Sequence, residues 1–331
     1  IRLENMVARG EMPPENKKPL AAAEKAAIQG WFHESFVLRG GKSHIGSTPL
    51  RRLTRYEFEN TLEAVLAVPL KAPYRDSITG TLAESKITML VPSDIPGESG
   101  FDNDAHRLGA LKPPLNAFAD AANYALGQLR RNPAAIKAVL GRAEIPSAAS
   151  EDEAKAIISK FLLRAFRGNA ARMLDYERVF HGLYAKHVAT SKDSRASLLH
   201  VFEMILVSPE FLYRFEHSQA QSTPYPVNGL ELATRLSYFL WAGPPDAELM
   251  KLGQDGSLLK EAVLKKQIGR LLNSPKRIAL SENFAGQWLG FGELMANREY
   301  LLNERWNRET YDEALFFFDE LIRSNRSVLE L

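Results

Sequence analysis

The densest group of polar side chains in the sequence lies between Asp94 and His106. Asp94, Asp102 and Asp104 are carboxylates here, and a glutamate, an asparagine and two glycines lie among them. Carboxylates at alternate positions suit a hard cation such as Ca²⁺, which takes six or more oxygen ligands. The spacing therefore makes Asp94, Asp102 and Asp104 candidate metal ligands and makes this stretch the expected functional site.

A second interpretation of the same stretch stays open. The spacing departs from the EF-hand pattern, which needs a glycine at the sixth position and a glutamate at the twelfth. Aspartate and asparagine beside glycine also form turns and cap helices, because their short side chains bond the nearby backbone. The sequence alone does not separate a metal site from a set of turns.

Other catalytic patterns are missing from the sequence. Its seven histidines show no His-x-x-x-His or His-Glu-x-x-His spacing, and residues 97–100 (GESG) are not a Gly-x-Ser-x-Gly elbow. The chain has no cysteine, which excludes disulfides, thiolate catalysis and Cys-based zinc or iron–sulfur sites. No catalytic residue can be assigned, so the sequence leaves open whether the chain is an enzyme.

Composition limits the partners that the chain can attract. Formal net charge is +2 over 331 residues, with acidic and basic residues interspersed. The basic pairs Arg51–Arg52, Arg130–Arg131 and Lys265–Lys266 are isolated, which favours solvated helix edges over phosphate contacts. We therefore expect no nucleic-acid partner, and no apolar run reaches the length of a membrane span.

Helical periodicity dominates the elements that must position these residues. Thr54 and Glu57 form a predicted capping box ahead of Phe58 and Leu62 on one face, and similar patterns recur along the chain. Alternation typical of strands is scarce. The sequence predicts a mainly α fold, built as multi-helix bundles of helical hairpins, with one long irregular region at 69–111 that holds any short strand pairs.

Large apolar residues at helical spacing predict the core. Leu232, Leu236, Phe239 and Leu240 are assigned to one stripe, and a helix starting at Ser274–Pro275 is assigned an inner face of Ile278, Phe284, Ala285, Trp288 and Leu289. Trp241 and Trp288 are interpreted as core residues and not as ligand contacts. The residues predicted to be buried are Phe161, Leu162, Phe166, Leu206, Phe211, Leu236, Phe239, Trp241, Phe284 and Trp288.

Three blocks carry a family resemblance. YPVNGLELATRLSYFLWAGPPDAEL and ENFAGQWLG resemble a helical domain of unknown function found in large exported proteins of planctomycetes, usually joined to a c-type cytochrome domain. LRRLTRYEFENTLEAVL with PSDIPGESGFDNDAHRL, and AIISKFLLRAFR with LLHVFEMILVSPEFLYRFE, resemble the two domains that precede it there. The resemblance implies a fragment with five parts: a cytochrome remnant (1–38), a linker (39–49), a first helical domain (50–146), a second (147–220) and a third, truncated at its C-terminus (221–331).

The N-terminal segment resembles the closing part of the planctomycete-type cytochrome c domain. GEMPP followed by a helix ending in Trp31 carries this likeness, and Met12 matches the distal haem ligand by its Pro-Pro context. That domain attaches haem through Cys-x-x-Cys-His, which the chain lacks. The resemblance therefore implies haem c in the full-length parent and none in this chain alone, where Met12 reads as a loop residue of a truncated domain.

The expected function rests on the family resemblance alone, since no catalytic residue is assigned. The resemblance implies an exported, periplasmic protein linked to a cytochrome c and associated with electron transfer or oxidoreduction, with an electron-transfer protein as partner. The competing class is a helical scaffold or binding module that holds a partner protein or a polysaccharide.

Overall fold

The computed structural model describes residues 6–7, 12–14, 16–39, 42–43, 50–71, 74–75, 82–83, 85–110, 113–216, 225–296 and 304–330. It consists of two compact units, Ile1–Thr48 with Gln221–Pro224, and Pro49–Ala220 with Tyr225–Leu331. Most of the predicted linker at 39–49 lies outside the described residues, and the predicted domain borders stay predictions. The described residues are mainly helical, which confirms the predicted fold class.

The first unit is small and contains one long helix. Helix α2 (Ala22–Phe32) continues as a π-helical turn, His33–Val37, and no residue of α2 is buried. Strands β1 (Leu38–Arg39) and β2 (Lys42–Ser43) pair antiparallel. This pair falls outside 69–111, so the prediction that strands occur only there was wrong. A strand of two residues is too short to show alternation, and the Gly-Gly at 40–41 was the available hairpin signal.

The second unit begins with helix α3 (Arg55–Leu66). Its predicted capping box is confirmed, because Thr54 Oγ1 accepts from the Glu57 amide and the Glu57 carboxylate accepts from the Thr54 amide. The region predicted to be irregular contains two short strands that pair antiparallel and two short helices. The elements after α3 are β3 (Tyr74–Arg75), β4 (Leu82–Ala83), α4 (Lys86–Leu90), α5 (Ala105–Ala110), α6 (Leu115–Arg130), α7 (Pro133–Leu140), α8 (Glu151–Ala165), α9 (Ala170–Ser191), α10 (Ser194–Leu206) and α11 (Pro209–Leu212).

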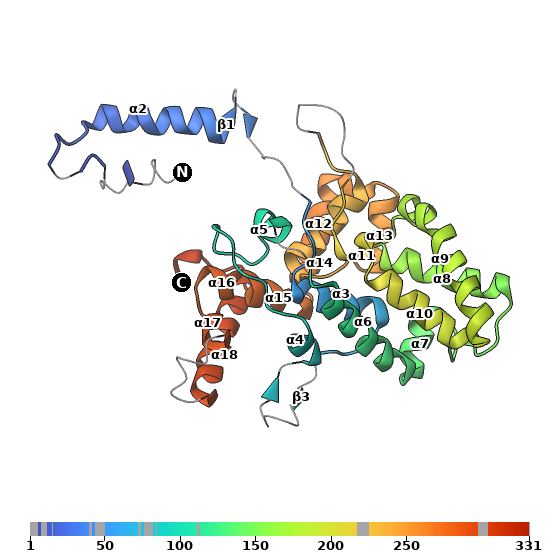
Figure 1. Ribbon diagram of the computed structural model, residues 1–331. Coiled ribbons are helices and arrows are strands. Elements are labelled where there is room, and N and C mark those ends of the chain that lie inside the picture. The colour runs from blue at the N-terminus through green and yellow to red at the C-terminus, as the bar shows by residue number, and fades with distance from the viewer. Residues whose placement is uncertain are drawn as a thin grey trace. The chain divides into compact units, whose positions relative to one another are not determined.

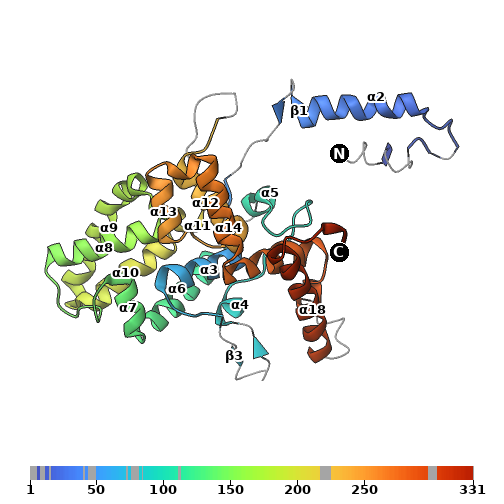
Figure 2. The ribbon, with the colours of Figure 1, turned by 180° about the vertical axis from the view of Figure 1, so that it is seen from behind.

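The second half of this unit is also helical, with short helices and turns between α12 (Gly229–Trp241) and the 20-residue helix α18 (Glu304–Arg323) (Figures 1 and 2). Asp246 caps the helix Ala247–Gln254 by accepting from the Leu249 amide, as the sequence indicated. The elements are α12 (Gly229–Trp241), α13 (Ala247–Gln254), a 3₁₀ turn (Ser257–Leu259), α14 (Glu261–Leu272), a 3₁₀ turn (Pro275–Arg277), α15 (Ile278–Leu280), a π-helical turn (Ser281–Ala285), α16 (Gly286–Trp288), α17 (Glu293–Ala296), α18 (Glu304–Arg323) and a 3₁₀ turn (Val328–Glu330).

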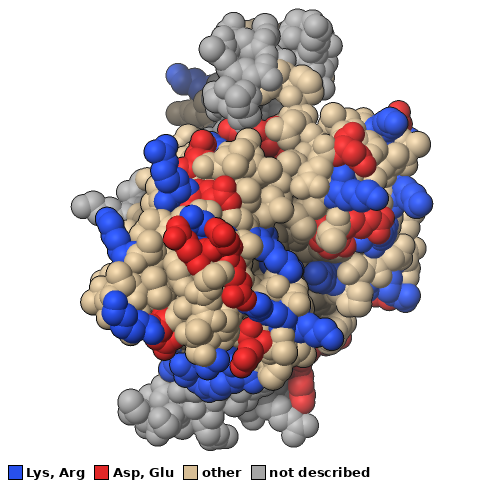
Figure 3. Space-filling model, turned by 90° about the vertical axis from the view of Figure 1, so that its right-hand side faces the viewer, with Lys and Arg blue, Asp and Glu red and all other residues tan. Residues whose placement is uncertain are grey.

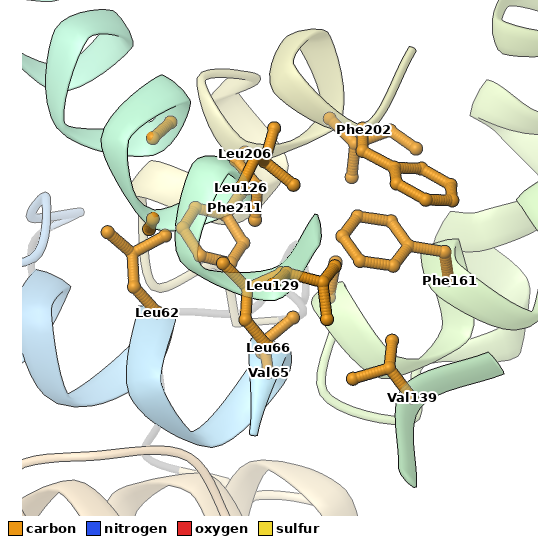
Figure 4. Packing of buried hydrophobic residues seen from close by; sticks show 14 of the residues in the cluster. Leu62, Val65, Leu66, Leu126, Leu129, Val139, Phe161, Phe202, Leu206 and Phe211 are labelled. Carbon is orange, nitrogen blue, oxygen red and sulfur yellow. The ribbon is translucent and has the colours of Figure 1, made fainter. Parts of the chain in front are cut away.

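The main hydrophobic core joins α3, α6, α7, α8, α10 and α11 (Figure 4). Phe161 of α8 and Phe202 of α10 stack at its centre with ring centroids 4.1 Å apart, and both are fully buried. Each such side chain contributes about 1.5–3 kcal/mol through the apolar surface it removes from water. Because α3 packs into this core, the core fixes the position of α3 and of the residues that precede it.

Most of the predicted core is confirmed. Phe161, Leu162, Phe166, Leu206, Phe211 and Trp241 are buried, and Leu236 is half-buried against a second, smaller core. The indole nitrogen of Trp241 donates to the Leu271 carbonyl at 3.0 Å. Trp241 is therefore a core residue, as predicted.

Phe239 is the first exception, because 64% of its surface is exposed. The buried face of α12 runs through Ala233, Ser237 and Trp241, which are four residues apart, and Phe239 points away from it. The prediction followed the large side chains. Of the predicted stripe, Leu240 is buried and Leu232 and Leu236 pack against the smaller core, so Phe239 alone lies off the buried face.

Phe284, Trp288 and Leu289 are also exposed, at 38%, 53% and 44%. The predicted inner face assumed one uninterrupted α-helix. The π-helical turn Ser281–Ala285 has a wider hydrogen-bond spacing, so it rotates all following residues relative to those before it. Ala285 stays buried, whereas the aromatic residues turn outward.

Candidate functional site

The three predicted metal ligands have separate partners. Asp94 accepts from Arg52 Nη2 at 2.5 Å and from the Arg55 amide at 2.6 Å, so its buried carboxylate pairs with a guanidinium and supports the start of α3. Asp104 accepts from the His106 and Arg107 amides and from Ser99 Oγ, which holds the start of α5. Both carboxylates are used within the protein.

Asp102 instead contacts Gln287 of helix α16. Its amide donates to Gln287 Oε1 at 2.7 Å, and Gln287 Nε2 donates to its carboxylate at 3.1 Å. Burial raises the pKa of Asp102 to about 6, and the charges of Asp94 and Glu57 add to this shift. Asp102 therefore ties the 94–106 loop to α16.

In the part of the chain that the structure describes, no group of three or more His, Asp or Glu side chains is placed to hold a metal ion. Asp94, Asp102 and Asp104 do not converge, because each is drawn to a different backbone or side-chain partner. The turn and capping interpretation accounts for Asp94 and Asp104, and a tertiary contact accounts for Asp102.

Met12 lies in the first unit. It is half-buried, its amide donates to the Met6 carbonyl at 3.2 Å, and Pro13 and Pro14 follow it before α2. Haem c requires two cysteine thioethers and an axial histidine beside its distal ligand, and the chain contains no cysteine. The residues of this chain therefore do not by themselves fit covalently attached haem.

A pocket of about 230 Å³ lies where the 94–106 loop meets α12 and the α15–α16 segment. We call it the arginine pocket, since three guanidinium groups are among its walls. Its lining residues are Arg51, Glu57, Phe101, Asn103, Arg214, Arg235, Tyr238, Phe239, Ala279, Leu280, Asn283 and Phe284.

The pairing of two distant segments builds one wall of this pocket. The Leu53 amide donates to the Leu212 carbonyl at 2.7 Å, and the Arg214 amide donates to the Arg51 carbonyl at 3.0 Å. Arg52 and Tyr213 form an antiparallel bridge between these two bonds. This short ladder places Arg51 opposite Arg214, although 163 positions separate them in the sequence.

Arg51 and Arg52 are not at a solvated helix edge, so that interpretation of the pair was wrong. Their side chains are 14% and 7% exposed. Arg51 Nη1 and Nη2 donate to the two oxygens of Glu57 at 2.6 and 2.7 Å. The two residues precede α3 in an extended segment, where the bridge to Tyr213 and the carboxylates of Glu57 and Asp94 hold them inside.

Glu57 is shared between two arginines. Burial acts to raise the pKa of Glu57, but the attraction and hydrogen bonds of Arg51, together with Arg214, outweigh burial and lower it. Arg214 reaches the same carboxylate only at 4.0 Å. Burial, followed by repulsion from Arg51, lowers the pKa of Arg214. The wall thus carries two guanidinium groups against one carboxylate.

Three aromatic rings continue outward from the pocket. Phe101 stacks on Phe284 with centroids 5.7 Å apart and planes 8° apart, and Phe284 stacks on Trp288 at 5.5 Å. We call Phe101, Phe284 and Trp288 the aromatic row. Phe101 and Phe284 belong to both the row and the pocket wall, so an exposed apolar surface borders a charged recess.

Two larger cavities lack this combination. One of about 550 Å³ lies between α6 and α10, and one of about 350 Å³ lies beside Trp241. In the latter, Lys71 and Lys276 lie over the rings of Tyr56 and Trp241, and the Tyr56 hydroxyl donates to Glu282. Their walls contain neither a member of the aromatic row nor one of the three guanidinium groups.

Surface charge agrees with the composition. On the face shown in Figure 3, basic and acidic side chains are interspersed and form no broad field of one sign. Among the described residues, no helix combines the length and apolar character needed to cross a bilayer.

Sequence reasoning missed the arginine pocket entirely. The 94–106 loop was predicted to be a functional region, and it contributes Phe101 and Asn103 to the pocket. No local signal connects Arg51 with Arg214 or Phe101 with Phe284. The exposed side chains of the aromatic row had been assigned to the core.

Comparison with known proteins gives one match. Residues 227–331 are similar to a family model described as PSD4, a protein of unknown function (DUF1592). No curated protein and no solved structure matches the chain. The matched stretch contributes Phe239 and Phe284 to the pocket and Trp288 to the aromatic row, whereas Arg51, Phe101 and Arg214 lie outside the matched stretch.

Proposed function

We propose that the second unit is a helical binding module for polysaccharide. The observation that carries this proposal is the aromatic row beside the arginine pocket. A sugar ring presents C–H groups on its faces and hydroxyls on its rim, so it packs on an aromatic ring while polar groups bond its edge. Trp288, the most exposed ring of the row, offers a face, and Asn103 and Asn283 offer amide donors and acceptors.

The size of the site favours a sugar over a folded protein partner. Pockets that enclose a complete small ligand measure about 300–1,000 Å³, whereas a specific protein interface buries more than about 1,000 Å². A recess of about 230 Å³ holds one sugar unit or substituent and leaves the rest of a chain along the aromatic row. The exposed side chains of Phe284 and Trp288 therefore provide an apolar surface beside the recess.

Isothermal titration against a panel of soluble polysaccharides tests the proposal. Trp288→Ala and Phe284→Ala should each remove most of the binding while leaving the fold intact, because both rings are exposed. Phe316 of α18 provides the control: it is 59% exposed and belongs neither to the row nor to the pocket wall. If Phe316→Ala weakens binding as much as Trp288→Ala, or if only a protein partner binds the row, the proposal fails.

A second proposal concerns a longer parent protein. We infer that the parent is exported to the periplasm and linked to a c-type cytochrome, with haem c as its cofactor and an electron-transfer protein as partner. The support is the sequence around Met12 together with α2, whose residues are all at least partly exposed and so leave a helix face for further structure to cover. Haem would supply one-electron transfer, and Met12 would be its distal ligand.

A protein extended upstream and matured with haem tests this second proposal. Met12→Ala should lower the reduction potential and remove the sulfur-to-iron absorption band, since thioether ligation raises the potential. Met6→Ala is the matched control, because Met6 lies in the same unit and offers Met12 only its backbone carbonyl. A Met12→Ala spectrum identical to that of the unchanged protein would rule Met12 out as the ligand.

A further inference from the structure

The donors of Arg214 are not used up by the protein. Arg51 already holds both oxygens of Glu57 at 2.6 and 2.7 Å, which leaves Arg214 with the same carboxylate at 4.0 Å. A guanidinium group carries five N–H donors and is always charged. Among the described residues, the contacts of the Arg214 side chain are this long one and a ring contact with Tyr238.

Arg214 is also held in place before any ligand binds. Its amide is bonded to the Arg51 carbonyl, and its guanidinium lies over the Tyr238 ring, 5.1 Å from the centroid. The Tyr238 hydroxyl is fixed in turn by Arg167 Nε at 3.0 Å and by Thr61 Oγ1 at 2.9 Å. A guanidinium that rests on a fixed ring loses little freedom when it binds a ligand, which favours affinity.

The pocket wall carries excess positive charge. Arg51 and Arg214 together carry two positive charges against the single negative charge of Glu57. Arg235 has its own carboxylate, because its Nε and Nη2 donate to Glu216 at 2.7 and 2.6 Å. A group of negative charge entering the pocket would therefore meet one uncompensated guanidinium.

We propose that Arg214 binds the carboxylate of an acidic sugar whose ring lies against the aromatic row. This inference rests on the proposed polysaccharide function and names the class of sugar. Arg214 and Phe284 line the same recess, so a sugar ring packed against the row beside Phe284 brings a substituent on its edge toward the guanidinium. The planar fork of Arg214 matches the two oxygens of a carboxylate, which gives paired and charge-assisted hydrogen bonds.

The test compares one sugar backbone in two charge states. Binding of an oligogalacturonide and of its methyl ester is measured by isothermal titration with the full chain. The acid should bind at least about tenfold more tightly than the ester, since a charge-assisted pair contributes more than a neutral bond. Equal binding of the acid and the ester would overturn the inference. This comparison needs no variant protein.

Variants then assign this preference to Arg214. Arg214→Met should bind acid and ester equally, whereas Arg214→Lys should keep part of the preference because it keeps the charge without the fork. Circular dichroism melting confirms that both variants fold. A preference that survives in Arg214→Met would overturn the role of Arg214.

Trp288→Ala separates this inference from the proposed function. It should weaken the acid and the ester by the same factor and leave the preference between them unchanged. If Trp288→Ala has no effect on either sugar, the polysaccharide function itself fails. The last measurement uses a sulfated oligosaccharide of the same length. If it binds as tightly as the carboxylated one, the guanidinium of Arg214 does not select the planar carboxylate, and that part of the inference is overturned.

Discussion

The Arg51 guanidinium donates to both carboxylate oxygens of Glu57, and the same carboxylate caps α3 by accepting from the Thr54 amide at 3.0 Å. Glu57 is thus a helix cap and the negative partner of a buried arginine at once. Breaking a buried ion pair from one side leaves an uncompensated charge, which costs about 3–5 kcal/mol. Glu57→Gln should lower the free energy of unfolding by about that amount at pH 7, measured by urea denaturation.

The effect of Glu57→Gln on the free energy of unfolding should depend on pH. The folded pKa of Glu57 is depressed, so its stabilising effect is present above the unfolded value of 4.5 and is lost as the pH falls below it. The difference between Glu57→Gln and the unchanged protein should therefore shrink in acid. Glu151 pairs with Lys155 at the surface, and Glu151→Gln should leave the unfolding midpoint unchanged.

Asp102→Asn should act in the opposite direction. Folding raises the pKa of Asp102 from 3.8 to about 6, so its favourable contribution is present below 3.8 and is lost as the pH rises through 6. Asparagine keeps an oxygen for Gln287 and carries no charge. At pH 7.5 the variant should be more stable by on the order of 1–2 kcal/mol, and at pH 4 the gain should disappear. A variant less stable than the parent at pH 7.5 would contradict this assignment.

Buried and exposed aromatic residues should respond differently to truncation. Phe202 stacks on Phe161 in the main core and is fully buried, so Phe202→Ala should cost about 3–5 kcal/mol through the cavity it leaves. Phe239 is mostly exposed, and Phe239→Ala should change stability by less than about 0.5 kcal/mol. Thermal melts of the two variants check this, and a large loss in Phe239→Ala would show that α12 buries a different face.

Two helical glycines should also respond differently to substitution by alanine. A Cβ on Gly229 of α12 would lie 2.3 Å from the Gly253 carbonyl oxygen of α13, whereas a Cβ on Gly269 of α14 meets nothing within 4 Å. Gly229→Ala should therefore destabilise by about 1–3 kcal/mol, because two backbones must separate. Gly269→Ala should instead stabilise by about 0.5–1 kcal/mol, as alanine favours the helix. Urea denaturation distinguishes the two outcomes.

Local features of the fold were readable from the sequence by itself. The helical period, the Thr54–Glu57 capping box, the Asp246 cap and the burial of Phe161, Phe211 and Trp241 all depend on residues within a few positions of one another. Helix formation and capping involve bonds between near neighbours, so a linear pattern contains the required information.

The tertiary structure alone decided the site. Arg51 lies opposite Arg214 because two extended segments pair across 163 positions, and Phe101 meets Phe284 because Asp102 bonds Gln287. One π-helical turn moved Trp288 from the expected core to the surface. Long-range pairing depends on the whole packing arrangement, and a single extra residue in a helical turn rotates everything after it. Neither effect leaves a periodic signal in the residues it rearranges.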